Sequence, residues 1–298
     1  MKPFGFVFPG QGSQSVGMLG GWKGHAAVRG ALVEASEALG EDIGQLIENG
    51  PTELLALTTN TQPVMLVAGV AAFRVWMAET GAAPSVLAGH SLGEYSALVA
   101  AGVLTLTDAA PLVRFRAQAM QDAVPVGMGA MAAILGLDAN TVIDGCEEAA
   151  RSFGPSTTEV VEAVNFNDPL QTVIAGTKAA VDKACEVLKA NGARRALPLT
   201  VSAPFHSTLM KPAAEALREK LATTHLAAPS IPVVNNIEVA FETDADRIRA
   251  ALVRQAFGPV RWVECVRRIK SLGVATVVEC GPGKILAGMA KRIDSELT

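Results

Sequence analysis

A five-residue stretch, Gly89-His90-Ser91-Leu92-Gly93, places the strongest constraint on how this chain folds. It follows the apolar run "PSVLA" and precedes the helical pattern "EYSALVAAG". Because glycine destabilises strands and helices alike, two glycines around one hydroxyl predict a tight strand-to-helix turn. A Gly-x-Ser-x-Gly turn lifts its serine off the edge of a sheet, and the following helix points unpaired amides at it. Ser91 is therefore either an exposed nucleophile or a cap within a glycine-rich turn.

The rest of the chain alternates short β-rich runs with longer helical patterns, which predicts βα units around a mostly parallel sheet. Within residues 126–198, strands are expected in "GMGAMAAILGL", "VEAVNFNDPLQTVIAG" and "ARRALPL". Their order with the intervening helices, β-α-β-β-α-β, is that of a ferredoxin-like unit. We therefore predict an α/β protein in which a small ferredoxin-like subdomain, residues 126–198, is inserted into a large subdomain, residues 1–125 and 199–298.

The composition excludes several classes of function. The 298 residues carry a net charge of −4 without a basic cluster, so a nucleic-acid partner is not expected. No apolar run reaches the ~18 residues of a membrane span, and the apolar start of the chain is too short for a signal peptide, so we expect a cytoplasmic protein. No metal or disulfide framework is expected, because CxxC spacing is lacking among the cysteines, Cys146, Cys185, Cys265 and Cys280.

A nucleophilic serine needs a base, and four histidines are available. His25 lies in a polar early helix and is expected at the surface, and His225 lies near a helix end. His90 adjoins Ser91, so its side chain should point away from the hydroxyl. His206, in "VSAPFHSTLMKPAA", lies between an extended segment and a helix start, where catalytic groups tend to be displayed. His206 is the best candidate base, with a structural histidine as the alternative.

The segment "TDAAPLVRFRAQAMQDAV" is predicted to be a helix capped by Thr107 or Asp108, with Pro111 in its first turn. Arg114 should face solvent. Arg116 should point inward, because the residues three and four positions away are apolar, namely Leu112, Val113, Ala119 and Met120. A buried guanidinium is costly unless it is paired. It therefore either pairs with a buried carboxylate or receives an anionic ligand, such as a carboxylated acyl group held by two hydrogen bonds.

Glycines also mark both ends of the chain. The stretch "FPGQGSQSVGM" places Gly10 and Gly12 after a strand, but Ser15 stands where a dinucleotide-binding loop needs its third glycine. Nucleotide binding is therefore disfavoured, no cofactor is expected, and a backbone amide at Gln11 is a candidate oxyanion donor. The glycines of "ECGPGKIL" are interpreted as a turn.

Taken together, these motifs resemble the malonyl-CoA:acyl carrier protein transacylases, the freestanding enzymes of bacterial fatty-acid synthesis. The resemblance covers nearly the whole chain. Its motifs occur in the family's order, namely Gly10-Gln11-Gly12-Ser13-Gln14, Gly89–Leu98, Arg116, Asn165-Phe166-Asn167, Phe205-His206, Asn235-Asn236 and Gly281-Pro282-Gly283. It implies a hydrolase-like large subdomain, a ferredoxin-like small one and an active site between them.

The resemblance also implies roles for particular residues. Ser91 would be the nucleophile and His206 its base, oriented by the main-chain carbonyl of Gln255 instead of by an acid. The backbone amides of Gln11 and Leu92 would form the oxyanion hole. Two further residues would select the acyl group, Arg116 by binding the malonyl carboxylate and Phe205 by excluding a branched chain.

The implied partners are malonyl-CoA and acyl carrier protein, and we expect a monomer that is a protein in its own right. Three alternatives stay open. The chain could serve malonate decarboxylation or polyketide synthesis with the same chemistry. It could be a serine hydrolase that uses the same elbow, since aspartates lie between Ser91 and His206. It could also be a non-catalytic scaffold, although a scaffold has no need of both residues.

Overall fold

A computed structural model describes residues 3–201 and 203–298, and its centre is a parallel sheet of four strands. The strand order is β7-β2-β1-β8, and every neighbouring pair is parallel. The strands are β1 (Phe4–Phe8), β2 (Val86–Gly89), β7 (Val233–Val234) and β8 (Thr276–Glu279). β1 is buried along its whole length, as expected of a strand that is covered on both faces. We call this the large sheet.

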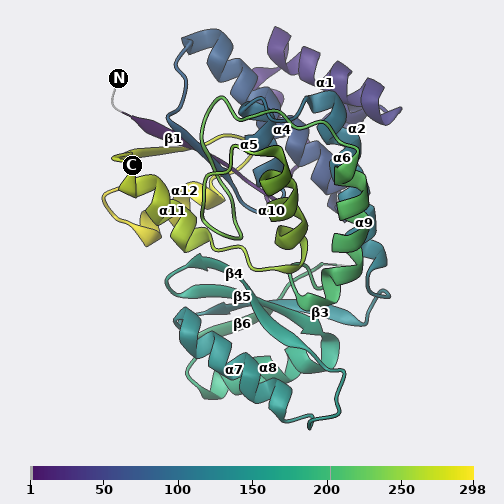
Figure 1. The fold of residues 1–298 in the computed structure, drawn as a ribbon, viewed down its shortest axis with the longest axis vertical. Coiled ribbons are helices and arrows are strands. Elements are labelled where there is room, and N and C mark those ends of the chain that lie inside the picture. Colours follow the sequence, from purple (N-terminus) through teal and green to yellow (C-terminus); the bar gives the residue numbers. More distant parts are fainter. Residues whose placement is uncertain (1–2, 202) are drawn as a thin grey trace.

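Helices cover the two faces of the large sheet in separate layers (Figure 1). The first layer comprises α1 (Ala26–Leu39), α4 (Thr58–Thr80), α5 (Gly93–Ala100), α6 (Leu106–Asp122), α9 (Lys211–Ala222) and α10 (Ala245–Phe257). The second layer comprises α11 (Trp262–Ser271) and α12 (Ile285–Ile293). Side chains alternate along β1, so Phe6 and Phe8 pack with the first layer while Val7 packs with the second. Short elements are η1 (Gly20–Trp22), α2 (Ile43–Asn49), α3 (Thr52–Ala56) and η2 (Thr208–Met210).

Helix α4 is apolar on all sides because it lies in the core. It is the one helix within residues 3–201 and 203–298 that is long and apolar enough to cross a membrane. In its apolar window, however, 72% of the residues are buried inside the protein. Phe73 and Trp76 of α4 stack edge-on against Phe6 of β1. These contacts identify α4 as the core helix of a fold consistent with a soluble protein.

A second, antiparallel sheet has the strand order β4-β5-β3-β6, and we call it the small sheet. Its elements are β3 (Gly129–Leu135), α7 (Ala139–Arg151), β4 (Val161–Asp168), β5 (Gln171–Thr177), α8 (Lys178–Ala190) and β6 (Arg195–Pro198). β5 lies between β3 and β4, which is the arrangement of a split βαβ unit. The predicted fold class is therefore confirmed. The exact subdomain boundaries, at residues 126 and 198, stay a prediction.

The small sheet uses its two faces differently. Ala132 and Ile134 of β3 face α7 and α8, which lie at the far end of the molecule (Figure 1). Met131 and Ala133, on the opposite face, pack with Phe205 and other residues of the larger half. Strand alternation thus turns one side of the small sheet toward the rest of the protein.

The sequence predictions were wrong about three local features. Thr105, not Thr107 or Asp108, caps α6, because its Oγ1 accepts a hydrogen bond from the Asp108 amide at 3.0 Å. Pro111 is the sixth residue of that helix, beyond its first turn. His25 does not lie within a helix, since its Nδ1 caps α1 by accepting from the Ala27 amide. In addition, α11 and α12 were not predicted.

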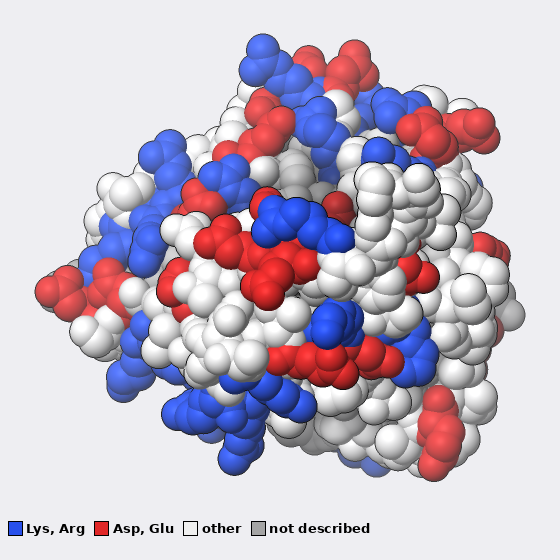
Figure 2. Space-filling model, turned by 90° about the horizontal axis from the view of Figure 1, so that it is seen from below, with Lys and Arg blue, Asp and Glu red and all other residues white. Residues whose placement is uncertain are grey.

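The face that carries α7 and α8 has positive and negative side chains interspersed (Figure 2). Several form ion pairs along these two helices, namely Arg151–Glu147, Lys178–Asp182 and Lys183–Glu186. Exposed pairs of this kind contribute little to stability. The mixture of charges does not form the basic stripe that a nucleic-acid-binding face requires.

The strand-to-helix turn at Ser91 depends on the absence of two side chains. A Cβ on Gly89 would lie 1.9 Å from the backbone carbon of Gly93. A Cβ on Gly93 would lie 2.0 Å from the carbonyl oxygen of Phe8 in β1. Both obstacles are backbone atoms, which cannot move aside as the end of a side chain can. The two glycines therefore allow α5 to start directly against the large sheet.

We expect Gly93→Ala to destabilise the protein by about 3 kcal/mol or more, because the added methyl group overpacks a rigid site. The matched control is Gly30→Ala on the exposed side of α1, where a Cβ would meet nothing within 4 Å. The control should stabilise the protein by about 0.5–1 kcal/mol. Urea unfolding of both variants measures the difference, and equal effects would contradict the steric argument.

Candidate active site

Ser91 lies at the tip of the turn between β2 and α5, and its backbone is in the left-handed region with a φ of 52°. A non-glycine residue there carries about 1–3 kcal/mol of strain, so the surrounding structure must hold it. Asn236, in the loop after β7, supplies that support. Its Oδ1 accepts from the Ser91 amide at 2.7 Å, and its Nδ2 donates to the Gly89 carbonyl at 2.7 Å. One carboxamide thus clamps both sides of the turn.

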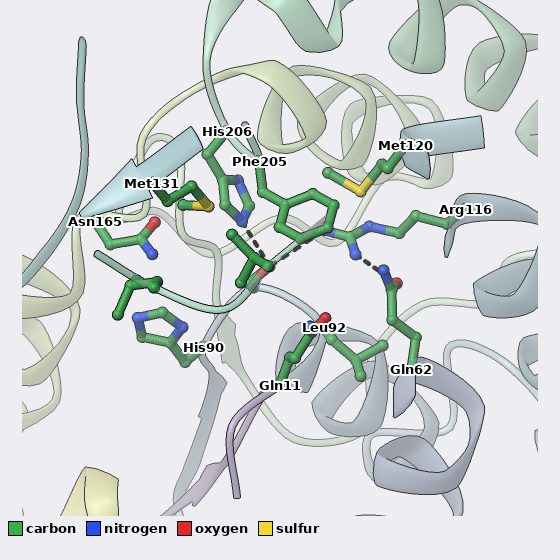
Figure 3. A pocket seen from close by; sticks show the side chains of 13 residues that line it. Gln11, Gln62, His90, Leu92, Arg116, Met120, Met131, Asn165, Phe205 and His206 are labelled. Carbon is green, nitrogen blue, oxygen red and sulfur yellow. Dashed lines mark hydrogen bonds between the residues drawn. The ribbon is translucent and has the colours of Figure 1, made fainter. Parts of the chain in front are cut away.

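His206 meets Ser91 from the segment before α9. Its Nε2 lies 2.7 Å from Ser91 Oγ, and its Nδ1 lies 2.8 Å from the carbonyl oxygen of Gln255 (Figure 3). A carbonyl oxygen only accepts, so Nδ1 must carry the proton and donate it. The lone pair of Nε2 then faces the serine hydroxyl. This is the tautomer that a general base needs.

The environment keeps the imidazole of His206 neutral. Its side chain is buried, and burial together with the positive charge of Arg116 lowers the pKa of His206 to about 3. At neutral pH the ring therefore has a free lone pair and can accept the serine proton. Its orienting partner is a backbone carbonyl, so the arrangement differs from a Ser-His-Asp triad.

Arg116 points into the interior, as predicted, and only 2% of the residue is exposed. Its Nη1 donates to Gln62 Oε1 at 2.6 Å. Its Nη2 donates to Gln255 Oε1 at 3.0 Å and lies 3.2 Å from Ser91 Oγ. No carboxylate pairs with it within the described ranges, 3–201 and 203–298. The guanidinium thus stands beside the serine with neutral partners, and burial lowers its pKa.

Arg114, two residues earlier on α6, is more exposed than Arg116, as the sequence predicted. Its side chain is half-buried and forms an ion pair with Glu41 near the surface. The guanidinium carbon of Arg116, in contrast, lies 5.4 Å from the centre of the Tyr95 ring. The sequence left two partners open for Arg116, a buried carboxylate or a ligand, and the structure places only neutral groups on its donors.

Gln11 and Leu92 both line the same cavity. Leu92 is the N-cap residue of α5, and Gln11 follows β1 in the loop beneath it. In the part of the chain that the structure describes, neither amide donates to a protein acceptor. The side chain of Gln11 is engaged elsewhere, since its Oε1 accepts from Thr58 Oγ1 at 2.9 Å. Two unpaired amides next to a nucleophile can stabilise a developing oxyanion.

The cavity has a volume of about 120 Å³ and lies between the two sheets. Its polar lining includes Ser91, together with His206 and Arg116, which are labelled in Figure 3. The apolar wall of the lining consists of Met120, Met131 and Phe205, which pack in one cluster and lie next to His206 and Arg116 in Figure 3. Leu199 and Val201 complete it. A cavity of this size and lining suits a short acyl chain with one polar end.

Six of the predicted site residues line this cavity, namely Ser91, His206, Arg116, Gln11, Leu92 and Phe205. Gln255 lies outside its lining and contacts His206 through its carbonyl oxygen. The chemical roles of these residues stay predictions. Sequence reasoning missed the contributions of Gln62, Asn236 and Glu94. Gln62 lies on an apolar helix and leaves no sequence signal. Asn236 and Glu94 were part of quoted motifs, but their partners lie more than 140 residues away in the chain.

His90 and His225 do not contact the hydroxyl of Ser91 within the described residues. His90 points away from the serine hydroxyl, as predicted, with its Nε2 2.8 Å from Asn167 Oδ1 and its ring against Trp262. His225 is exposed after α9. Over the described ranges the four cysteines are free, and no cluster of three or more potential metal ligands occurs.

The fold and site define a class of enzyme in which a hydrogen-bonded serine and histidine lie beside a buried cation. The chain belongs to the acyl transferase domain family, whose model matches residues 5–293. It is 52% identical over 299 aligned residues to the malonyl CoA-acyl carrier protein transacylase of Escherichia coli K12, covering 100% of this chain and 95% of that protein.

Solved structures agree with this assignment. The acyl-carrier-protein S-malonyltransferase from Burkholderia pseudomallei 1710b matches with a TM-score of 0.96 and 64% identity, over 99% of this chain and 94% of that one. A malonyl-transacylase solved in complex with a type II PKS acyl-carrier protein matches with a TM-score of 0.95 and 49% identity, over 99% and 94%. The family predicted from the sequence is therefore confirmed.

Acidification tests whether folded His206 is neutral. In the unfolded chain its pKa is near 6.5, whereas the folded value is about 3. Between pH 6.5 and pH 3 the unfolded state binds a proton that the folded state does not. The free energy of unfolding therefore decreases as the pH is lowered, by up to ~1.4 kcal/mol per pH unit. The pKa of Glu94 is raised to about 7, so this carboxylate has the opposite effect and increases the free energy of unfolding as the pH is lowered. We expect His206→Asn to remove the destabilising contribution of the histidine. The free energy of unfolding of this variant should therefore decrease less than that of wild type between pH 6.5 and 4.

Urea titrations at each pH measure this difference. The control is His225→Asn, at an exposed histidine, which should follow wild type. If His206→Asn also runs parallel to wild type, the folded imidazole is not held neutral.

Proposed function

We propose that this chain transfers the malonyl group from malonyl-CoA to the phosphopantetheine thiol of acyl carrier protein, through a malonyl ester on Ser91. The observation that carries this proposal is the guanidinium of Arg116, buried 3.2 Å from Ser91 Oγ with only neutral partners. An acyl group with its own carboxylate supplies the missing anion. The names of the relatives support the same substrate and carrier.

In the first half-reaction His206 Nε2 removes the proton of Ser91 as Oγ attacks the thioester carbonyl. The amides of Gln11 and Leu92 stabilise the tetrahedral oxyanion. The intermediate collapses, the C–S bond breaks, and the CoA sulfur leaves with the proton from Nε2. In the second half-reaction the carrier thiol gives its proton to Nε2 and attacks the ester. Ser91 Oγ then leaves and takes that proton back, which restores the free enzyme.

The same geometry selects the acyl group. A malonyl chain spans the short distance between its carbonyl at Ser91 and its carboxylate at Arg116. Phe205, only 9% exposed, packs with Met120 and Met131 along the apolar wall, where a branch on the acyl chain would need space. We propose that this wall limits transfer of branched acyl groups.

A serine hydrolase is the weaker alternative. Its base would normally be oriented by a carboxylate, whereas the Nδ1 of His206 donates to a backbone carbonyl. We propose that the malonyl groups are used for fatty-acid chain elongation. We also propose that the active enzyme is a cytoplasmic monomer. Polyketide synthesis is a second candidate, because one similar structure was solved with a type II PKS carrier.

Intact-protein mass spectrometry tests the intermediate. We expect incubation with malonyl-CoA to add one malonyl group to wild type and none to Ser91→Ala. Added carrier protein should discharge the adduct quickly and water slowly. An adduct that survives in Ser91→Ala would place the ester elsewhere, and an adduct that water clears at once would identify a hydrolase.

Arg116→Ala should change which acyl group is transferred. A hydrogen bond to a charged group contributes about 1.5–3 kcal/mol, so the preference for malonyl over acetyl should fall at least tenfold. The matched control is Arg114→Ala on the same helix, whose partner lies near the surface. Competition between malonyl-CoA and acetyl-CoA, with both acyl-enzymes quantified, measures the ratio. An equal loss of both activities would contradict the carboxylate-binding role.

A further inference from the structure

Glu94 is a buried carboxylate beside the active site that the proposed mechanism does not use. It is the second residue of α5, three positions after the nucleophile, and 2% exposed. Its Oε2 accepts two hydrogen bonds, from the Asn236 amide at 2.9 Å and from Gln255 Nε2 at 3.0 Å. Burying a charged group is costly unless hydrogen bonds or an opposite charge offset the loss of water. The hydrogen bonds to Glu94 therefore indicate a specific role for its charge.

Both partners of Glu94 hold the reacting residues. Asn236 binds the Ser91 amide through its side chain, at 2.7 Å. Gln255 orients His206 through its main-chain carbonyl, at 2.8 Å. The Nε2 of Gln255 also donates to the Ser91 carbonyl, at 3.0 Å. One carboxylate therefore joins the turn that carries the nucleophile to the helix that orients the base.

The carboxamide of Gln255 also links Glu94 to the buried cation. Its Nε2 donates to Glu94, and its Oε1 accepts from Arg116 Nη2 at 3.0 Å. The three groups form a line of anion, amide and cation. Glu94 makes no ion pair of its own with Arg116 in the part of the chain that the structure describes. The anion can thus balance the cation without occupying the donors that a ligand needs.

We propose that Glu94 is a positioning residue that provides the counter-charge of Arg116 through Gln255 and stabilises the protonated form of His206 during acyl transfer. The proposal rests on the proposed function. A carboxylate in direct contact with Arg116 would compete with the substrate carboxylate. Glu94 instead interacts with Arg116 through the carboxamide of Gln255. Low local dielectric lets such a chain of hydrogen bonds transmit charge stabilisation.

The ionisable groups around Glu94 come from three helices. They are Arg116 of α6, Tyr95 of α5 and Cys265 of α11. Burial raises the pKa of Glu94 to about 7, and the hydrogen bonds from Gln255 and Asn236, followed by the charge of Arg116, partly oppose this rise. The carboxylate, and with it the support for His206, is therefore present above pH 7 and lost below it. His206 itself stays neutral down to about pH 3, so it does not cause an acid limb near 7.

Glu94→Gln keeps the shape of the side chain and removes its charge. We expect the rate of acyl-enzyme formation at pH 8 to fall about ten- to a hundredfold, with malonyl-CoA and with acetyl-CoA alike. The acid limb near pH 7 in kcat/KM for acetyl-CoA should disappear, because that limb reports the free enzyme. Rapid quench followed by mass spectrometry measures the rates.

The matched control is Glu279→Gln. Glu279 is also partly buried, with a raised pKa and a bond to the Ala287 amide, but it lies outside the cavity. It should keep the wild-type rate and pH profile. A Glu94→Gln enzyme with the wild-type rate and the same acid limb would reduce Glu94 to a structural residue and overturn the proposal.

A second measurement avoids changing Glu94. In Arg116→Ala the carboxylate loses its counter-charge, so the acid limb of acetyl transfer should move above pH 7. An unmoved limb would contradict the coupling. If wild type forms no ester on Ser91, the proposed function fails instead. In that case urea unfolding still tests the coupling, since the destabilisation by Glu94→Gln and Arg116→Ala together should be smaller than the sum of the two single effects.

Discussion

The close contact between the nucleophile turn and the first strand is the constraint on which the site depends. A Cβ at Gly93 would lie 2.0 Å from the Phe8 carbonyl, so α5 can start there only without a side chain. This approach places the start of α5, which Leu92 caps, against the end of β1, from which the chain continues to Gln11. The pairing of β1 with β2 in the large sheet therefore also sets the spacing of the two proposed oxyanion donors.

The negative charge of Glu94 is separated from the reacting atoms by a neutral carboxamide, whereas the cation Arg116 lies directly beside Ser91 Oγ. His206 is oriented by a carbonyl and Arg116 by carboxamides, so neither has a carboxylate in contact. A direct acid partner would raise the pKa of the histidine but would also compete for the guanidinium. Because the carboxamide of Gln255 separates Glu94 from Arg116, the guanidinium stays open to a carboxylated substrate. Without a direct acid partner, the buried imidazole of His206 is only weakly basic.

Local patterns predicted the parts of this protein that depend on neighbours along the chain. The turn at Ser91, the inward direction of Arg116 and the order of helices and strands along the ferredoxin-like unit all follow from short-range periodicity and turn chemistry. The cap at Thr105 was missed because Thr107 and Asp108 are equally good caps in sequence, and only the helix start chooses among them. Family resemblance, not spacing, supplied Gln255.

The sequence by itself determined the alternation of elements, the position of the nucleophile turn and the residue types available for catalysis. Tertiary structure alone decided which of these residues meet. Asn236 reaches the Ser91 amide across 145 positions, and Gln255 reaches Glu94 across 161. Hydrogen bonds of this range depend on how strands are ordered in the large sheet and how α10 packs beside it. Burial is the main cause of the pKa shifts of His206 and Glu94, and it exists only in the packed tertiary structure.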